Sequence, residues 1–290
     1  MFALGLLAAL AASALFNLGV ALQALDAREQ PKDHGMRLSL LARLVRRRRW
    51  LLGFALGGLG FPLEVLAFAD APFVVVQPVL AAGLVLLLVL GVRLLGERVG
   101  RPEVVGVLAI VGGIALVAWG APDHTETHRA AGQVAAVVIV LSLLAFAPFA
   151  LRGRRWETAM VAIVGSALAF AAGNIATKLM ADDFNNDHWQ SASVWLAITI
   201  VTGVAAIVLE MTALQRAKAT TVVPVSFAIQ TFLPIALEPL FLRERLATAE
   251  FYGAPLVMGI ALLLVGTLAV SRTRAVTELV SPDEAPAARA

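Results

Sequence analysis

Long apolar blocks recur along the chain, and their length constrains the fold more than any other feature. Of the 290 residues, 60% are hydrophobic and only 15% are charged, whereas soluble domains average about 45–50% apolar and about 25% charged residues. A helix needs about 20 predominantly apolar residues to cross a bilayer. Within lipid, each backbone N–H and C=O must also be paired inside its own segment. The sequence therefore predicts an all-α polytopic membrane protein.

We expect nine membrane-crossing helices in two repeats of four and five. The first repeat, residues 1–120, contains predicted spans at 2–24, 50–69, 72–95 and 102–119. The second repeat, residues 121–271, contains predicted spans at 132–151, 158–180, 193–214, 220–242 and 250–270. Residues 272–290 lack apolar periodicity and are predicted to form a disordered cytoplasmic tail.

Basic residues lie between the apolar blocks with a strong bias to one side. If the N-terminus is outside, the 23 Lys and Arg residues are all cytoplasmic except Arg129, Lys178, Arg243 and Arg245. Cytoplasmic loops are the ones enriched in Lys and Arg. We therefore expect a multi-pass protein of the plasma (cytoplasmic) membrane, with the N-terminus outside and the C-terminus in the cytoplasm. The segment 36–49 is too short and too charged to span, and it predicts an interfacial helix that anchors the topology or contacts anionic lipid.

Two parts of the chain resemble each other. Glu210 follows Glu64 by 146 residues, and each glutamate precedes a proline, Pro224 or Pro78, by fourteen residues. Further along, at an offset of 147, an ordered set matches its relatives: Leu95, Glu97, Arg98, Gly106 and Gly112 with Leu242, Glu244, Arg245, Gly253 and Gly259. Spans 72–95 and 220–242 would cross in opposite directions. The two halves are therefore predicted to be inverted, an arrangement from which many secondary transporters build alternating access.

This two-fold pattern resembles the drug/metabolite transporter (DMT, EamA-like) superfamily over nearly all of residues 1–270. Four segments are also similar to the NIPA-type magnesium transporters, as is the nine-span count: Trp50-Leu51-Leu52-Gly53, Ala69-Asp70-Ala71-Pro72, Val76-Gln77-Pro78 and Gly96-Glu97-Arg98. That branch typically has Gly-Glu in its second span, whereas Gly60 stands at the aligned position here and Glu64 follows one turn later. The resemblance implies a secondary transporter, and its nearest branch implies Mg²⁺ or another divalent cation as substrate.

Ionisable residues inside predicted spans are costly and are therefore candidates for function. Glu64 falls toward the outer end of its span, and Glu210 toward the inner end of its own. Each would bind a metal cation when ionised or carry a proton when burial favours the neutral form. The alternative is that each reaches the nearer membrane interface. Glu238 lies between Pro234 and Pro239, which would either free carbonyls to line a cavity or only set helix packing.

Neutral polar residues and prolines give a second group of pathway candidates. The polar residues would bond either a solute or a neighbouring helix: Asn17, Gln77, Asn174 and Gln230. Pro78 and Pro224 remove backbone hydrogen bonds in the paired helices, so they are candidates for helix breaks or gating, together with Pro234 and Pro239.

Two predicted external loops gather carboxylates and imidazoles: Asp123, His124, Glu126 and His128, then Asp182, Asp183, Asp187 and His188. Carboxylates suit Mg²⁺, although solvated charge clusters also occur without a metal. The chain contains no cysteine, no Gly-rich phosphate loop and no His-Glu-x-x-His motif. We therefore expect neither an enzyme nor a bound cofactor.

The leading prediction is a secondary transporter, with a metal cation as one substrate class. A proton-coupled exporter of a small organic metabolite or drug is the alternative, and a lipid scramblase or a non-transporting membrane subunit is the alternative of another class. The expected partners are the solute and the lipid bilayer. The basic residues indicate topology instead of nucleic-acid binding, and the sequence leaves a homodimer open.

Overall fold

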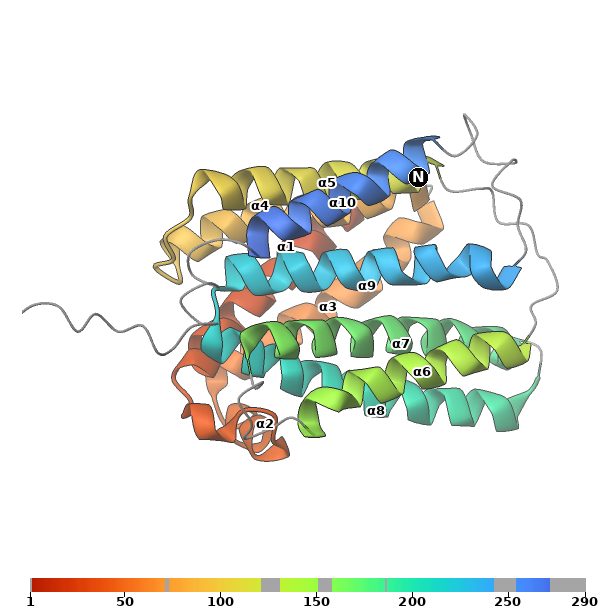
Figure 1. Cartoon of the computed structure of the whole chain (residues 1–290), viewed down its shortest axis with the longest axis horizontal. Coiled ribbons are helices and arrows are strands. Elements are labelled where there is room, and N and C mark those ends of the chain that lie inside the picture. Colours follow the sequence, from red (N-terminus) through yellow and green to blue (C-terminus); the bar gives the residue numbers. More distant parts are fainter. Residues whose placement is uncertain are drawn as a thin grey trace, which may run out of the picture.

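The computed structural model describes residues 2–70, 73–120, 131–150, 158–185, 187–242 and 254–271, which form helices with no strand among them. Figure 1 shows the long helices lying side by side in one bundle. They are α1 (Phe2–Arg28), α3 (Arg48–Asp70), α4 (Phe73–Arg93), α5 (Arg101–Gly120), α6 (Ala131–Ala150), α7 (Ala159–Asn185), α8 (Trp189–Arg216), α9 (Ala219–Leu242) and α10 (Ala254–Ser271). A 3-10 turn, η1 (Lys32–His34), and a short helix, α2 (Leu38–Leu44), join α1 to α3. The predicted all-α class is confirmed, and the predicted spans overlap the long helices; the nine-span count and the inverted repeats stay predictions.

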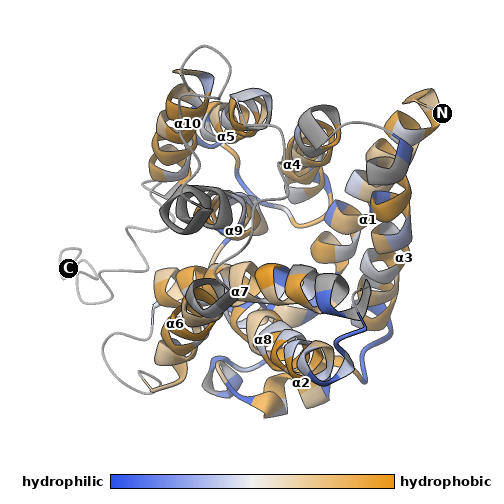
Figure 2. Ribbon diagram, turned by 90° about the vertical axis from the view of Figure 1, so that its right-hand side faces the viewer, coloured by the Kyte–Doolittle hydropathy of each residue, from blue (hydrophilic) through white to orange (hydrophobic). Residues whose placement is uncertain are grey.

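Four stretches of the described chain are long and apolar enough to cross a membrane: Phe2–Arg28, Arg48–Ala67, Ala159–Thr177 and Trp189–Arg216. Shorter apolar helical stretches occupy Pro78–Arg93, Ala135–Ala150 and Ala254–Val270. Large apolar side chains also face outward, as Leu7, Leu143 and Val257 do with 64%, 67% and 64% of their surface exposed. Figure 2, which looks along the bundle, shows hydrophobic residues over the helices. These features identify a helical membrane protein.

Close helix packing depends on glycines. The most extensive contacts are those of α1 with α3, α7 with α8, and α5 with α10. Where α1 crosses α3, a Cβ atom added to Gly53 would lie 2.5 Å from the carbonyl oxygen of Gly19. Between α5 and α10, a Cβ on Gly113 would lie 2.9 Å from the Gly259 carbonyl oxygen. Small residues at these positions allow membrane helices to approach backbone to backbone.

Basic residues gather at one end of the bundle, which we call the basic end and which is on the left in Figure 1. Helix ends and turns at this end carry Arg28, Lys32, Arg37, Arg43, Arg46, Arg47, Arg48, Arg49, Arg93, Arg98, Arg101, Arg216 and Lys218. Part of the main hydrophobic cluster lies at the same end, with Met36, Leu40, Leu44, Trp50, Met211 and Leu214 among its members. Leu40 and Leu44 of α2 are fully buried, whereas Leu38 is exposed. The apolar residues of segment 36–49 thus pack partly against the protein itself.

Candidate functional site

Glu97 lies in the turn between α4 and α5, at the basic end. The preceding residue, Gly96, has a φ angle of 64°, a left-handed conformation that glycine adopts without a Cβ penalty. The Glu97 backbone N–H donates a hydrogen bond to the Gly91 carbonyl at 2.8 Å. Only 3% of the Glu97 side chain is exposed. The turn therefore directs this carboxylate into the protein.

The Glu97 carboxylate accepts hydrogen bonds from the first two residues of α9. The Ala219 N–H donates to Oε1 at 2.6 Å, and the N–H and hydroxyl of Thr220 donate to Oε2 at 3.0 and 2.5 Å. N–H groups in the first turn of a helix have no partner within that helix, and the helix dipole favours a negative charge there. A residue from the first half of the chain thus caps a helix of the second half.

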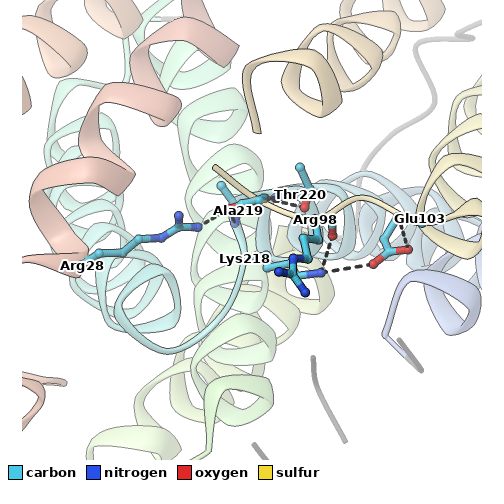
Figure 3. A network of polar contacts seen from close by, with 8 residues as sticks. Arg28, Arg98, Glu103, Lys218, Ala219 and Thr220 are labelled. Carbon is cyan, nitrogen blue, oxygen red and sulfur yellow. Dashed lines mark hydrogen bonds and ion pairs between the residues drawn. The ribbon is translucent and has the colours of Figure 1, made fainter. Parts of the chain in front are cut away.

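Arg28, the last residue of α1, forms an ion pair with the Glu97 carboxylate. Figure 3 shows the Arg28 side chain pointing from its helix toward Ala219. A buried charge is stable only when it is paired and its hydrogen bonds are satisfied. Here the Arg28 guanidinium pairs the charge and the start of α9 donates the hydrogen bonds. Helix α1, the α4–α5 turn and α9 therefore meet at the Glu97 side chain.

Glu103 adds a second link between the same segments. Its Oε2 accepts a hydrogen bond from the Gly100 N–H at 3.0 Å, and its Oε1 lies 3.4 Å from Lys218 Nζ. Lys218 precedes α9 directly and also donates to the Arg98 carbonyl oxygen at 2.6 Å. Figure 3 shows Lys218 linked by dashed lines to both Arg98 and Glu103. We call this set the helix-end network: Arg28, Glu97, Arg98, Glu103, Lys218, Ala219 and Thr220.

Further contacts at the basic end join the α1–α3 region to α8. The Met36 N–H donates to Thr212 Oγ1 at 2.8 Å, and Trp50 Nε1 lies 3.2 Å from the Met211 sulfur. A polar pocket of about 200 Å³ lies on the nearby surface, lined by Asp26, Glu29, Arg47, Arg48 and Arg49. Because Arg47 and Arg49 already pair with Glu29, this pocket is an ion-paired surface instead of an obvious anion site.

The two predicted carboxylates lie on α3 and α8. Glu64 and Glu210 are both partly buried, and no hydrogen bond or ion pair joins either to another described residue. Gly57 and Gly203 precede them by seven residues, which places each glycine on the helix face of its carboxylate, about two turns away. A Cβ atom added to either glycine would meet no atom within 4 Å. These helix faces therefore have free space beside them.

The other predicted pathway residues are dispersed. Asn17 is buried between α1 and α4, where its side chain donates to the Ser13 carbonyl at 2.8 Å, and Ser13 donates to the Leu80 carbonyl at 2.7 Å. This supports a role in helix packing for Asn17. Asn174 is exposed, Gln230 and Pro78 are partly buried, and Pro224 is buried. The side chains of Gln77, Pro234, Glu238 and Pro239 lie outside the described part of the structure.

The predicted external metal loops gain no support from the residues that are described. His188 Nδ1 lies 3.9 Å from Asp183 Oδ1 on the surface, and no group of three or more His, Cys, Asp and Glu residues in the described ranges could hold a metal ion. The loop with Asp123, His124, Glu126 and His128 lies outside those ranges, as do the tail 272–290, the segment 243–253 with Glu244, and the side chains of Lys178 and Asp182.

Sequence reasoning did not single out Glu97 or Glu103 as site residues. Glu97 belongs to the internal repeat, which was a usable signal, but its place beyond a span indicated a surface loop. Its partners on α9 are 122 and 123 residues away, so no local pattern predicts the contact.

Comparisons of the chain with protein-family models, with curated proteins and with solved structures found no match. What the protein does is therefore inferred from its own helices, repeats and buried charges.

Proposed function

We propose that the protein is a secondary transporter of the DMT type, which moves a small solute across the membrane by alternating access of two inverted halves, residues 1–120 and 121–271. The observation that carries this proposal is the correspondence between helix contacts in the two halves. Repeats of opposite orientation around a central site are a common construction among secondary transporters.

Helix boundaries support the correspondence. The ends of α3 and α8 are 146 residues apart, as are the starts of α4 and α9. Pro78 and Pro224 are therefore each the sixth residue of their helix. The same offset separates Glu64 from Glu210. The sequence repeat and the helix boundaries thus share one register.

Helix neighbours support it further. Helix α1 packs on α3 and α4, and α7 packs on α8 and α9. Ser13 of α1 donates to the carbonyl of Leu80 in α4, while the Ser166 hydroxyl of α7 lies 3.4 Å from that of Ser226 in α9. Leu80 and Ser226 are again 146 residues apart. The last helices of the halves, α5 and α10, pack antiparallel, as equivalent helices around a two-fold axis in the membrane plane would.

Contacts between the halves differ at the two ends. Helix α1 contacts α8, and α5 contacts α9. The equivalent pairs, α7 with α3 and α10 with α4, make at most slight contact among the described residues. Hydrogen bonds and ion pairs between the halves at the basic end fit one state of an alternating cycle, the state closed at that end.

Glu64 and Glu210 make a divalent cation such as Mg²⁺ the first substrate to test, because hard cations bind carboxylate oxygens. Proton-coupled exchange of a small organic solute is the second candidate. It is favoured by the lack of any cationic partner for either carboxylate among the described residues, since a carboxyl in an apolar helix is also suited to carry a proton.

The test is Mg²⁺ flux into proteoliposomes that hold a trapped indicator, for the wild type, Glu64→Gln, Glu210→Gln and a control, Glu29→Gln. Glu29 is an exposed carboxylate at the basic end. We expect saturable flux in the wild type and the control, and flux at the liposome background in the two span variants. Folded wild-type protein that carries neither Mg²⁺ nor a proton-driven organic solute would refute the proposal, and lipid scrambling in the same liposomes would replace it.

A further inference from the structure

We propose that Glu97 holds the basic end of the bundle closed, and that breaking its contacts with α9 opens this end to solute. The inference rests on the proposed transporter function and assigns a gating residue to it. Glu97 belongs to the first half of the chain, whereas Ala219 and Thr220 belong to the second. All three α9 hydrogen bonds of this carboxylate therefore cross the boundary between the halves.

Burial keeps water from replacing the hydrogen bonds between Glu97 and α9. Ala219 and Thr220 are both 0% exposed, so water does not compete for the carboxylate. Apolar contacts are non-directional and adapt when helices slide. Hydrogen bonds require short distances and good angles, so a displacement of the α9 start breaks all three together.

Glu103 is less suited to this role. Its contact with Lys218 is longer, at 3.4 Å, and the Lys218 side chain is 26% exposed. Water can therefore replace one partner of that pair without a change in helix position. Arg28, the ionic partner of Glu97, is similarly exposed at 27%, but the three α9 donors of Glu97 are buried, so water cannot replace them while the end is closed.

The open state is also accessible to Glu97. Its turn lies at the end of the bundle. When the carboxylate loses the N–H and hydroxyl donors of α9, entering water can hydrate it. Either the α9 start or water satisfies the charge, so two arrangements are stable and intermediate ones leave it unsatisfied. Switching elements are bistable in this sense.

Close packing of α9 against Gly91 of α4 is a second, independent observation that supports the proposal. A Cβ atom added to Gly91 would lie 2.3 Å from Thr220 Cγ2 and 3.1 Å from Glu97 Oε2. The first turn of α9 therefore fits against α4 only because residue 91 has no side chain. A substitution at this position displaces α9 without changing any charge.

The chain contains no cysteine, so a single introduced thiol reports on opening. Thr221 is 1% exposed and its hydroxyl has no hydrogen-bond partner in the described structure, which makes Thr221→Cys a mild substitution. The experiment measures the rate at which a hydrophilic maleimide labels full-length Thr221→Cys protein in nanodiscs. The same reporter is then combined with Glu97→Gln, with Gly91→Ala, and with the control Glu29→Gln.

We expect labelling to accelerate roughly tenfold with Glu97→Gln and with Gly91→Ala, a shift of about 1.4 kcal/mol in the opening equilibrium, and to stay unchanged with Glu29→Gln. Size-exclusion profiles verify that each variant is folded. Equal labelling rates in all folded variants would overturn the assignment of Glu97.

The outcome is separable from that of the transport assay, because labelling needs no solute. Accelerated labelling together with inactive wild-type protein supports Glu97 as the closing contact and removes the transporter proposal. Transport by the wild type together with unchanged labelling overturns the role of Glu97 and retains the transporter.

Discussion

Asp26 and Glu97 are buried carboxylates that each cap a helix from a distant part of the chain. Asp26 of α1 is 2% exposed and accepts a hydrogen bond at 2.8 Å from the Trp50 N–H, the third residue of α3. This is the bond that an N-cap side chain normally supplies from within the same segment. In this protein the cap also fixes how one helix lies against another.

We expect Asp26→Ala to lower the free energy of unfolding by about 1–2 kcal/mol, because it removes a helix cap and leaves a buried N–H unpaired. Thermal unfolding in detergent, followed by circular dichroism, measures the change. Glu29→Ala is the control, since Glu29 makes only exposed ion pairs, which contribute little. Equal losses for both variants would show that the Asp26 cap has no special role.

At the residue scale, sequence analysis was informative where a single position is unusual by itself. Glu64 and Glu210 stand out because charge is rare in apolar spans, and their placement on α3 and α8 follows from the span boundaries. Asn17 could be a solute ligand or a packing residue from sequence alone, and only its contact partners favour packing. Glu97 was missed because its contact partners are distant in the chain.

The glycine contacts between α5 and α10 show how elements are held at close range. Gly106 and Gly113 lie seven residues apart on α5 and approach Gly266 and Gly259 on α10. A Cβ atom at Gly106 would lie 2.9 Å from the Gly266 carbonyl oxygen. Because the obstructing atoms are backbone, the helices would have to separate to accept a side chain.

We expect Gly113→Ala to destabilise the protein and Gly58→Ala to leave its stability unchanged or slightly higher. A Cβ at Gly58 would meet no atom within 4 Å, and alanine is favoured over glycine inside a helix by about 0.5–1 kcal/mol. The temperature at which half of the protein leaves the monodisperse peak on size exclusion measures both. A Gly113→Ala variant as stable as Gly58→Ala would contradict the close contact.

Helix positions could be predicted because the apolar blocks are about as long as a helix that crosses a bilayer. The segment 36–49 was predicted only in part. Its short apolar periodicity indicated a helix at the surface, and α2 is that helix, but the burial of Leu40 and Leu44 against the core depends on α8. Periodicity reveals an apolar face and does not identify what covers it.

For the whole molecule, the distribution of Lys and Arg predicts that the basic end faces the cytoplasm. Ser39 is exposed on α2 at the basic end, and Ser191 is exposed in the first turn of α8 at the other end. We expect a membrane-impermeant thiol reagent added to intact cells to label Ser191→Cys and not Ser39→Cys. Labelling of Ser39→Cys and not of Ser191→Cys would show that the basic end faces outward.

The relation between the halves is predicted from a few matched positions, and it stays a prediction that helix contacts can be compared with. A sequence repeat shows that two segments are alike, but it does not show whether they touch. The antiparallel α5–α10 contact and the hydrogen bonds between Glu97 and the start of α9 arise from tertiary packing, which a repeat offset does not encode.

The link between Glu97 and the start of α9 also has a consequence for biogenesis. Ala219 is made 122 residues after Glu97. The first half of the chain therefore enters the membrane while this carboxylate still lacks its hydrogen-bond donors on α9. Its turn lies at the bundle end, where water can hydrate the charge in the meantime. Burial of Glu97 is therefore tied to arrival of α9, and a truncated chain that lacks α9 would keep an exposed acidic group by which it differs from a finished one.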